Sequence, residues 1–389
     1  MPSRITISTA FEGGSIGVEH IGARGDISLR LLADENAADT HWFYFRLAGA
    51  AGIDCRMTLV NSDSMARLAG RDEVPDCWTG YRPFVSDDGR HWVRTGAEYE
   101  AGRFTICHRP ARDLAWFAYF VPYTMERHAA LLGRCLGDPR VGLDILGTTP
   151  DGHDLEMLTI GSPGPGKPRL WIVGRQHASE TMASWFIEGF LARLLDRDDA
   201  LARALVESAV FHVVPVANPD GCVRGNTRTN ALAMNLNRAW AEPAPETAPE
   251  VVAIRSRMRA EGVDFFLDVH GDEELPYVFL GGPLEIPSKS ARLASLFARY
   301  QHAMAAASPD YRASDPYPGG PPAEADLRMA WNWVAEEFGC LTVLLEQPFK
   351  DTAHMPDATF GWSPARCGRF GAATLPAIAA VLPDLRSGR

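Results

Sequence analysis

The segment Leu170–Asp196, "LWIVGRQHASETMASWFIEGFLARLLD", combines a strand, a turn and a helix in one stretch of chain. Its first residues form an apolar run, as in a strand that is covered on both faces, and its last sixteen have the apolar spacing of an amphipathic helix. Between these two parts, His177 and Glu180 stand three residues apart, so their side chains can point at one spot. We therefore predict a strand–turn–helix unit whose turn carries a candidate metal site.

The same alternation of strands and helices continues along the chain. Apolar strands are predicted at "FHVVPVA", "FFLDVH" and "CLTVLLE", and helices at "MERHAALLGRCL", which Thr124 would cap, "APEVVAIRSRMRA" and "ADLRMAWNWVAEEF". Strands that are apolar throughout and alternate with helices favour an α/β fold with a mixed, mainly parallel sheet flanked by helices. We assign residues 125–389 to this α/β domain.

The chain before residue 125 has a different pattern of hydrophobic residues. Short alternating runs recur about every ten residues, with turn signals between them, which is typical of an all-β sandwich. These runs are "RITIST", "DISLRLLA", "HWFYFRLAG", "CRMTLVN", "HWVRTG", "RFTICH" and "LAWFAYFVPY". We therefore predict that residues 1–124 form an N-terminal β-sandwich domain that precedes the α/β domain.

Composition narrows the class of protein. The 389 residues are 46% hydrophobic and 22% charged, as in a globular protein, and the net charge of −11 argues against nucleic acid or an anionic membrane as a partner. No apolar run reaches the length of about 18 residues that a membrane span needs. The N-terminus lacks the apolar core of a secretory signal, and the seven cysteines are scattered without a CxxC pair. These features predict a cytoplasmic protein with reduced thiols.

Polar residues stand where four of the predicted strands end. His177 and Glu180 follow the first strand, "NPDG" (218–221) follows the second, and His270 and Glu346 close the other two. Open α/β sheets build their sites at the carboxyl ends of their strands. Two histidines and a carboxylate leave a fourth coordination position open, as in catalytic zinc sites, and zinc would activate a water and polarise a carbonyl. We predict one zinc ion per chain, with Glu346 as candidate general base.

The segment that begins with "NPDG" is rich in arginine and asparagine. Guanidinium groups bind carboxylates and developing oxyanions bidentately and stay charged, so a hydrolase with arginines beside the metal is expected to act on a substrate that bears a carboxylate. Within about twenty residues the segment contains Asn218, Arg224, Arg228, Asn235, Asn237 and Arg238. Arg224 is expected to have a surface role.

The order of these motifs resembles that of the zinc metallocarboxypeptidases (M14-type). The matching motifs are "HASE", "NPDG", "GNTR", "NLNRAW", "DVHG" and "LLEQPF", while "FEGGSI", "HWFYFRLAG" and "FAYFVPYTMERH" resemble the β-sandwich found in the cytosolic carboxypeptidase subgroup. The resemblance implies hydrolysis of the C-terminal peptide bond of peptides or proteins. It also implies zinc on His177, Glu180 and His270, and Glu346 as general base and proton shuttle.

The resemblance assigns further roles to the arginine-rich segment. It implies that Arg228 polarises the scissile carbonyl and holds the oxyanion, and that Asn237 and Arg238 bind the terminal carboxylate of the substrate. Arg328, in "EADLRMAWNW", would line the side-chain pocket, which would favour acidic C-terminal residues.

The sequence departs from the family at two points. Asn235 stands where the family often has an aspartate that orients the first zinc histidine; an amide can still accept that hydrogen bond but adds less basicity to the ligand. The mobile tyrosine of pancreatic-type members has no matching motif, although Tyr311 and Tyr317 lie in the loop from which it might come.

Two other classes of function share parts of this pattern. A zinc amidohydrolase of the aspartoacylase or succinylglutamate desuccinylase type, acting on N-acyl amino acids, has the HxxE pair, an Asn–Arg pair and a late glutamate, but usually lacks an N-terminal sandwich. A non-catalytic binding protein with a vestigial zinc site would use the sandwich as its working module, and the intact ligand set together with Glu346 argues against it.

Overall fold

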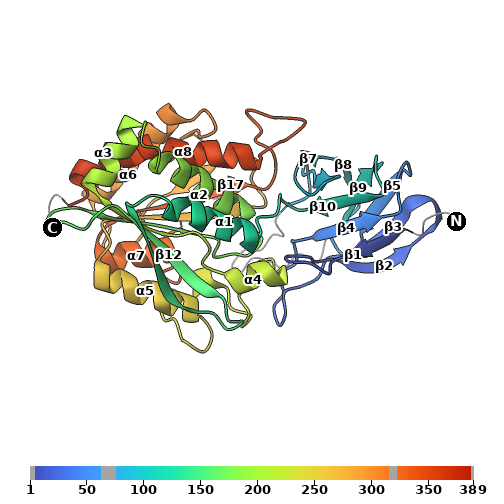
Figure 1. Cartoon of the computed structure of the whole chain (residues 1–389), viewed down its shortest axis with the longest axis horizontal. Helices are drawn as coiled ribbons and strands as arrows, with labels where there is room; N and C mark the ends of the chain where they lie inside the picture. The colour runs from blue at the N-terminus through green and yellow to red at the C-terminus, as the bar shows by residue number, and fades with distance from the viewer. Residues whose placement is uncertain (1–4, 63–75, 315–321, 387–389) are drawn as a thin grey trace.

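A computed structural model describes residues 5–62, 76–314 and 322–386. It has an all-β part followed by a larger α/β part (Figure 1). The predicted fold class, a mixed sheet flanked by helices and preceded by an all-β domain, is confirmed.

Among its described residues, the all-β part forms two five-stranded sheets. The first has the order β1 (Thr6–Ser8), β4 (Tyr44–Ala48), β10 (Leu114–Ala118), β6 (Phe84–Ser86) and β7 (Val93–Arg94). The second has the order β2 (Gly17–Ile21), β3 (Asp26–Arg30), β5 (Cys55–Leu59), β9 (Arg103–His108) and β8 (Gly96–Glu100), with a short helix η1 (Ala23–Gly25) before β3.

Alternation along the strands explains how the sandwich core forms. In β5, Cys55, Met57 and Leu59 are buried, whereas the residues between them are not. Side chains of a strand point alternately to the two faces of a sheet, so the period-two pattern in the sequence becomes one apolar inner face.

The α/β part is built on a seven-stranded sheet. Its order is β11 (Val141–Thr148), β12 (Asp154–Ile160), β14 (Val210–Val214), β13 (Arg169–Gly174), β15 (Phe265–Asp272), β17 (Leu341–Pro348) and β16 (Phe279–Gly281). The four central strands β14, β13, β15 and β17 are parallel, and the outer strands are antiparallel. The parallel strands are those that the sequence predicts as apolar throughout.

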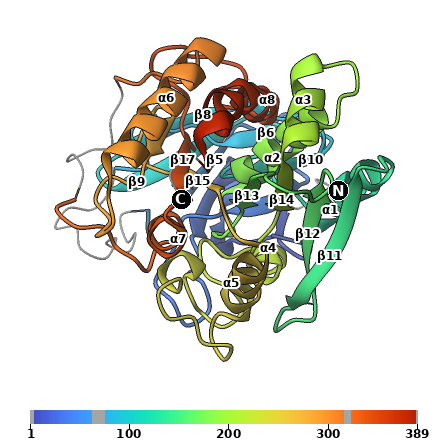
Figure 2. The same ribbon diagram turned by 90° about the vertical axis from the view of Figure 1, so that its left-hand side faces the viewer.

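Helices cover both faces of this sheet. One side carries α2 (Thr181–Leu194), α3 (Ala200–Ser208), α6 (Ala291–Ala307) and α8 (Pro364–Val381), and the other carries α5 (Pro249–Glu261) and α7 (Ala330–Phe338) (Figures 1 and 2). The remaining helices are α1 (Met125–Leu136), α4 (Pro219–Arg224), η2 (Leu236–Arg238) and η3 (Leu382–Asp384).

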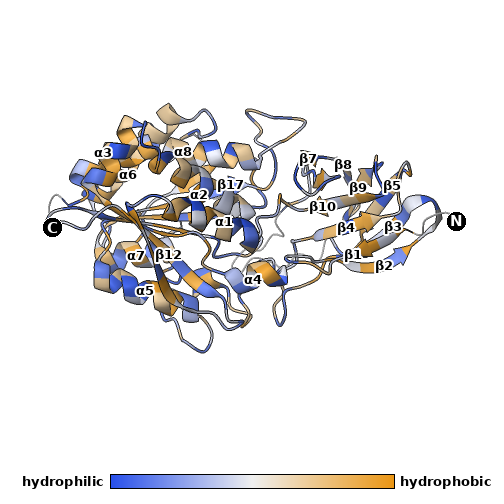
Figure 3. Ribbon diagram, in the orientation of Figure 1, coloured by the Kyte–Doolittle hydropathy of each residue, from blue (hydrophilic) through white to orange (hydrophobic). Residues whose placement is uncertain are grey.

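Strand β13 contributes to two apolar cores, one on each face of the sheet. Leu170 and Ile172 of β13 pack toward α2 and α8, whereas Trp171 and Val173 pack toward α5 and α7. Hydrophobic residues therefore gather along the sheet between the helical layers, and the outer helix surfaces are more polar (Figure 3).

The sandwich and the α/β part share one apolar core. Tyr119, just after β10, packs against Phe349, just after β17, with ring centroids 4.7 Å apart. The buried Arg94 of β7 donates from Nη2 to the carbonyl oxygens of Phe349 (2.8 Å) and Trp362 (3.3 Å). At the junction, Thr124 Oγ1 accepts a hydrogen bond from the Arg127 amide (3.2 Å), which confirms the predicted cap of α1.

Within the described ranges, no helix is long and apolar enough to cross a membrane. No disulfide joins any of the seven cysteines, all of which lie among the described residues.

Candidate active site

The loop after β13 carries the first two candidate ligands. It begins with Arg175, whose φ of 60° lies in the left-handed region that a side chain other than glycine occupies at a penalty of roughly 1–3 kcal/mol. The buried Arg175 guanidinium offsets this penalty by donating to the carbonyl of Ala178 (2.8 Å) and to Ser184 Oγ (3.1 Å). The tight loop that results places His177 beside Glu180 at the start of α2.

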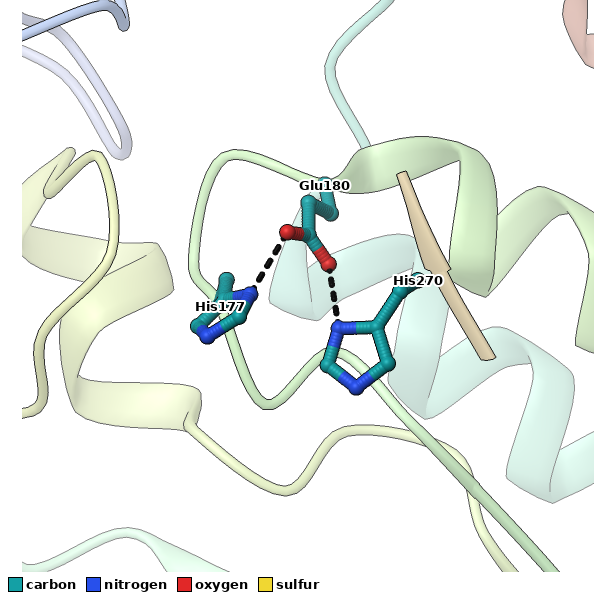
Figure 4. Close-up of side chains that lie close together, drawn as sticks. All are labelled: His177, Glu180 and His270. Atoms are coloured by element: carbon teal, nitrogen blue, oxygen red, sulfur yellow. Dashed lines mark hydrogen bonds and ion pairs between the residues drawn. The ribbon is translucent and has the colours of Figure 1, made fainter. Parts of the chain in front are cut away.

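Three buried side chains meet at this point (Figure 4). His177 Nδ1 lies 2.6 Å from Glu180 Oε1, and His270 Nδ1, from β15, lies 2.9 Å from Glu180 Oε2. One donor atom from each residue lies within 4.8 Å of the other two. Two imidazoles and a carboxylate are the donor set of a catalytic zinc site, so the side chains present fit a zinc ion.

The far nitrogens of both imidazoles are held by oxygen acceptors. His177 Nε2 lies 3.0 Å from Asn235 Oδ1, as expected for the amide that stands in place of the family's aspartate. His270 Nε2 lies 3.0 Å from Asp268 Oδ1. Such partners fix the tautomer and ring orientation of a ligand, and here they leave both Nδ1 atoms facing Glu180. Asp268 is missing from the predicted site, although it precedes His270 by two residues and so lies on the same face of β15.

Charge within the cluster suits a cation. Burial lowers the pKa of His177 to about 3, so its ring is neutral near pH 7, as a metal ligand must be. Burial alone would raise the pKa of Glu180, but His177 and His270 outweigh it and bring the pKa below its ordinary value. Burial opposes protonation of His270 too, yet Asp268 and Glu180 raise its pKa well above the usual range. The two carboxylates that face the His270 ring therefore favour positive charge at this point.

Glu346 lies beside this cluster on the neighbouring strand. It is the register partner of His270 in the parallel pair β15–β17. Its Oε2 is buried and has no hydrogen-bond partner among the described residues, and burial raises the pKa of the carboxyl well above its usual range. A buried polar atom without a partner is costly unless a water or a ligand satisfies it, so this oxygen marks the place where one would be held.

Arg228 lies against His177. Its Nη1 is 3.1 Å from His177 Nε2, its Nε is 3.4 Å from Asp39 Oδ1 and its Nη2 is 3.6 Å from Glu273 Oε1. Burial lowers the pKa of this guanidinium, but the surrounding carboxylates, Glu273 foremost, raise it above the ordinary value. Arg228 is therefore a buried cation at the edge of the His–Glu–His cluster.

Asn237 is held between two elements. Its Nδ2 lies 3.2 Å from His270 Nε2, and its Oδ1 accepts a hydrogen bond from the Ala330 amide at the start of α7 (2.8 Å). The side chain is buried beside the cluster.

Arg238 and Arg328 surround one carboxylate. Arg328 Nη2 donates to Asp326 Oδ2 (2.8 Å), and Arg238 Nε lies 3.9 Å from the same oxygen. Arg238 also donates from Nη1 to the carbonyl of Asn237 (2.8 Å). The Arg328 side chain is 62% exposed and that of Arg238 is 31% exposed, so both can be reached from solvent.

The other residues considered from the sequence have simpler settings. Arg224 pairs with Asp151 (2.7 Å) at the surface. Tyr311 is buried, and its hydroxyl lies 3.1 Å from Gln301 Nε2. Tyr317 lies outside the described residues.

The fold and the donor set together are those of a metal-dependent hydrolase with an α/β catalytic domain. Comparison with known families is more specific: "Zinc carboxypeptidase" matches residues 138–358, and "Cytosolic carboxypeptidase N-terminal domain" matches residues 7–120. The chain belongs to the zinc carboxypeptidase family, and it is a metallocarboxypeptidase.

Solved structures and curated proteins agree with this assignment. The chain is similar to a metallo-carboxypeptidase from Burkholderia cenocepacia (39% identity, TM-score 0.93, covering 98% of this chain and 100% of that one). It is equally close in fold to one from Pseudomonas aeruginosa (37% identity, TM-score 0.93, 98% and 100% covered). Human cytosolic carboxypeptidase 1 is 25% identical over 72% of this chain, which spans only 26% of the human protein.

Proposed function

We propose that this metallocarboxypeptidase holds one zinc ion through His177, Glu180 and His270 and uses Glu346 as its general base. The observation that carries the proposal is the buried His–Glu–His cluster beside Glu346 Oε2, which has no hydrogen-bond partner among the residues that the structure describes. The match of residues 7–120 to the cytosolic carboxypeptidase N-terminal domain favours this reading over an amidohydrolase of the aspartoacylase type.

The residues of the site divide the chemistry among them. Zinc, when bound, would polarise the scissile carbonyl and make a water more acidic. Glu346 takes a proton from the attacking water as the oxygen bonds to the carbonyl carbon, and delivers it to the nitrogen that leaves as the C–N bond breaks. Burial raises the pKa of this carboxyl above that of an exposed glutamate, and a group that accepts and then gives up a proton works best when its pKa is raised toward the working pH.

Arg228 stabilises the negative charge that develops on the carbonyl oxygen. A buried guanidinium that is held in place before the reaction needs no reorganisation when the charge appears. Its position against His177 puts this donor at the edge of the ligand cluster, where the carbonyl would lie.

The C-terminus of the substrate is recognised by arginine. Arg238, with the Asn237 amide, binds the α-carboxylate, and Arg328 favours a second carboxylate on the terminal side chain. The shared contact of both arginines with Asp326 supports this pairing because it shows that they reach one point. The Pseudomonas aeruginosa relative was solved in complex with (2-guanidinoethylmercapto)succinic acid, which carries two carboxyl groups and one guanidino group. Its carboxyl groups fit an arginine clamp, whereas its cationic group gives no support to the acidic preference.

One assay tests whether Arg238 and Asn237 bind the α-carboxylate of the substrate, an arrangement that we call the carboxylate clamp. Matched peptides ending in Glu, Lys, Leu and Glu-amide would be compared by kcat/KM. A hydrogen bond to a charged group contributes about 1.5–3 kcal/mol, and about 1.4 kcal/mol is a factor of ten, so amidation should lower kcat/KM at least about tenfold. Cleavage of the amide as fast as the free acid would reject an exopeptidase.

The acidic preference has a separate test. We expect Glu to be preferred over Lys, and Arg328→Ala to abolish that preference while leaving cleavage of the Leu peptide intact. Arg56→Ala is a matched control, because Arg56 is also half exposed and forms a comparable pair with Glu98 (2.7 Å) in the sandwich. A preference for Lys, or one that survives Arg328→Ala, would show that other residues shape the pocket.

We also infer a cytoplasmic location. It is supported by the names of the cytosolic relatives and by the seven cysteines, none of which forms a disulfide in the described part of the chain. Fractionation of cells that express the protein would test it, and recovery outside the cytoplasm would contradict it.

A further inference from the structure

The N-terminal sandwich reaches into the active site through the segment between β3 and β4. There the buried carboxylate of Asp34 accepts hydrogen bonds from three successive backbone amides, those of Thr227 (2.5 Å), Arg228 (2.8 Å) and Thr229 (2.8 Å), and from the Thr229 hydroxyl (3.0 Å). Successive N–H groups that converge in this way form an anion-binding concavity. Here the anion is a side chain supplied by the other domain.

Two further contacts lock the same loop. Thr227 Oγ1 accepts hydrogen bonds from the amides of His41 (3.0 Å) and Trp42 (3.1 Å), which belong to the Asp34 segment. The carbonyl of Thr227 accepts from the amide of Ser179 (3.0 Å), the neighbour of Glu180. The loop that bears Arg228 is thus fixed on one side to the sandwich and on the other to the metal-binding turn.

This loop depends on such contacts for its shape. Residues 226–230 belong to no helix or strand, and all five are buried. Without Asp34, the amides of residues 227–229 would be buried without a partner, at a penalty of about 1–3 kcal/mol each. The backbone would then shift to find other acceptors, and the Arg228 guanidinium would move with it.

We propose that Asp34 is a positioning residue for Arg228, so that the sandwich domain completes the active site. Asp34 acts through the backbone amides of residues 227–229 and the Thr229 hydroxyl, and it touches no reacting atom. The inference rests on the role proposed above for Arg228 in stabilising the oxyanion.

The primary test is Asp34→Asn. The amide keeps the shape of the carboxylate, but it replaces one acceptor oxygen with an NH2 group that faces N–H donors. Because Arg228 acts on charge that develops in the transition state, we expect kcat to fall about tenfold or more while KM changes less than about threefold. Zinc content should match that of the wild type, since the metal ligands are untouched.

A double-mutant cycle separates positioning from a general structural role. If Asp34 acts through Arg228, Asp34→Asn should change kcat less than about twofold in an Arg228→Ala background. An equal loss of kcat in both backgrounds, or no loss in the wild-type background, would overturn the proposal.

Two more variants keep the result decisive. Met57→Ala opens a cavity within strand β5 of the sandwich core, and should lower the stability by about 2–5 kcal/mol without changing kcat. If Asp34→Asn does not fold, Thr229→Val can replace it, because this variant removes only the hydroxyl contact to Asp34. A smaller loss of kcat that vanishes in the Arg228→Ala background would support a positioning role for Asp34. An unchanged kcat would overturn the proposal. Full activity of Arg228→Ala itself would instead reject the proposed oxyanion role.

Discussion

Glu346 shows most directly how burial and chemistry are linked at the residue scale. Its Oε2 is withheld from solvent without a hydrogen-bond partner in the described part of the chain. Such an arrangement is destabilising by itself, and it suits a group whose partner arrives with the reaction.

Replacing Glu346 with Gln tests this role. The amide preserves the shape but cannot accept the proton, so we expect unchanged zinc content and substrate affinity with kcat lowered about 10²–10⁴-fold. Metal analysis, substrate binding and steady-state kinetics on one preparation would measure all three. A variant that retains more than about a third of the wild-type kcat would contradict the assignment.

Measuring how tightly zinc is held tests the proposed ligands and the residues that hydrogen-bond to them. His177→Ala should lose the metal, and Asp268→Asn, which weakens the acceptor for His270, should bind zinc about 10–100-fold more weakly. Competition with a chelator would measure both, with Asp54→Asn on the exposed sandwich surface as control. Equal zinc content in His177→Ala and the wild type would reject the ligand set.

The sequence predicts the proposed ligands and Glu346 better than it predicts the residues that surround them. His177, Glu180, His270 and Glu346 could be predicted because each stands at the carboxyl end of a strand in a recognisable local pattern. Asp34 could not be predicted, because its partners lie 193–195 residues away and no sequence pattern near Asp34 indicates the contact.

The same distinction holds at the scale of elements. The four parallel strands are long and wholly apolar, so their pattern is strong. The short strands β2, β6 and β8 were not predicted: β6 is three residues long, and β8 has a largely exposed pattern with no alternation. In such strands pairing comes from the neighbouring strand rather than from the strand's own sequence.

Helix α5 contains a group that should make stability depend on pH. Glu250, in its first turn, is buried, and burial raises its pKa from 4.5 to about 7, although Asn230 Nδ2 donates to it (3.1 Å). The folded state thus holds this proton more tightly than the unfolded state does. The resulting stability is fully present below about pH 4.5 and is lost as the pH rises through about 7.

Glu250→Gln should remove this contribution. Between pH 5 and pH 8, the free energy of unfolding of the wild type should fall relative to that of the variant, by at most about 3 kcal/mol. Urea denaturation at several pH values would measure the difference. Parallel pH curves for the two proteins would mean that Glu250 titrates normally in the folded state.

At the scale of the whole molecule, the two domains should unfold together. Tyr119 and Phe120 of the sandwich pack on Phe349 of the α/β part, and the buried Arg94 bonds across the same junction. Separating the domains would expose these rings and leave a guanidinium without its acceptors. We expect one thermal transition, with calorimetry, far-UV circular dichroism and loss of activity sharing a midpoint. Two resolved transitions would contradict a shared core.

The contact between Asp34 and residues 227–229 also sets an order of assembly. During synthesis the sandwich emerges first, and almost two hundred residues must follow before its carboxylate meets the amides that it binds. Pairings so distant in the chain form late in folding, because the entropy of closing a long loop is lost before the contact repays it. The loop of residues 226–230, which bears Arg228, therefore takes its final shape only once the sandwich and the α/β part have docked. Given the role proposed above for Arg228, a chain whose two halves have not yet docked would be inactive as a peptidase.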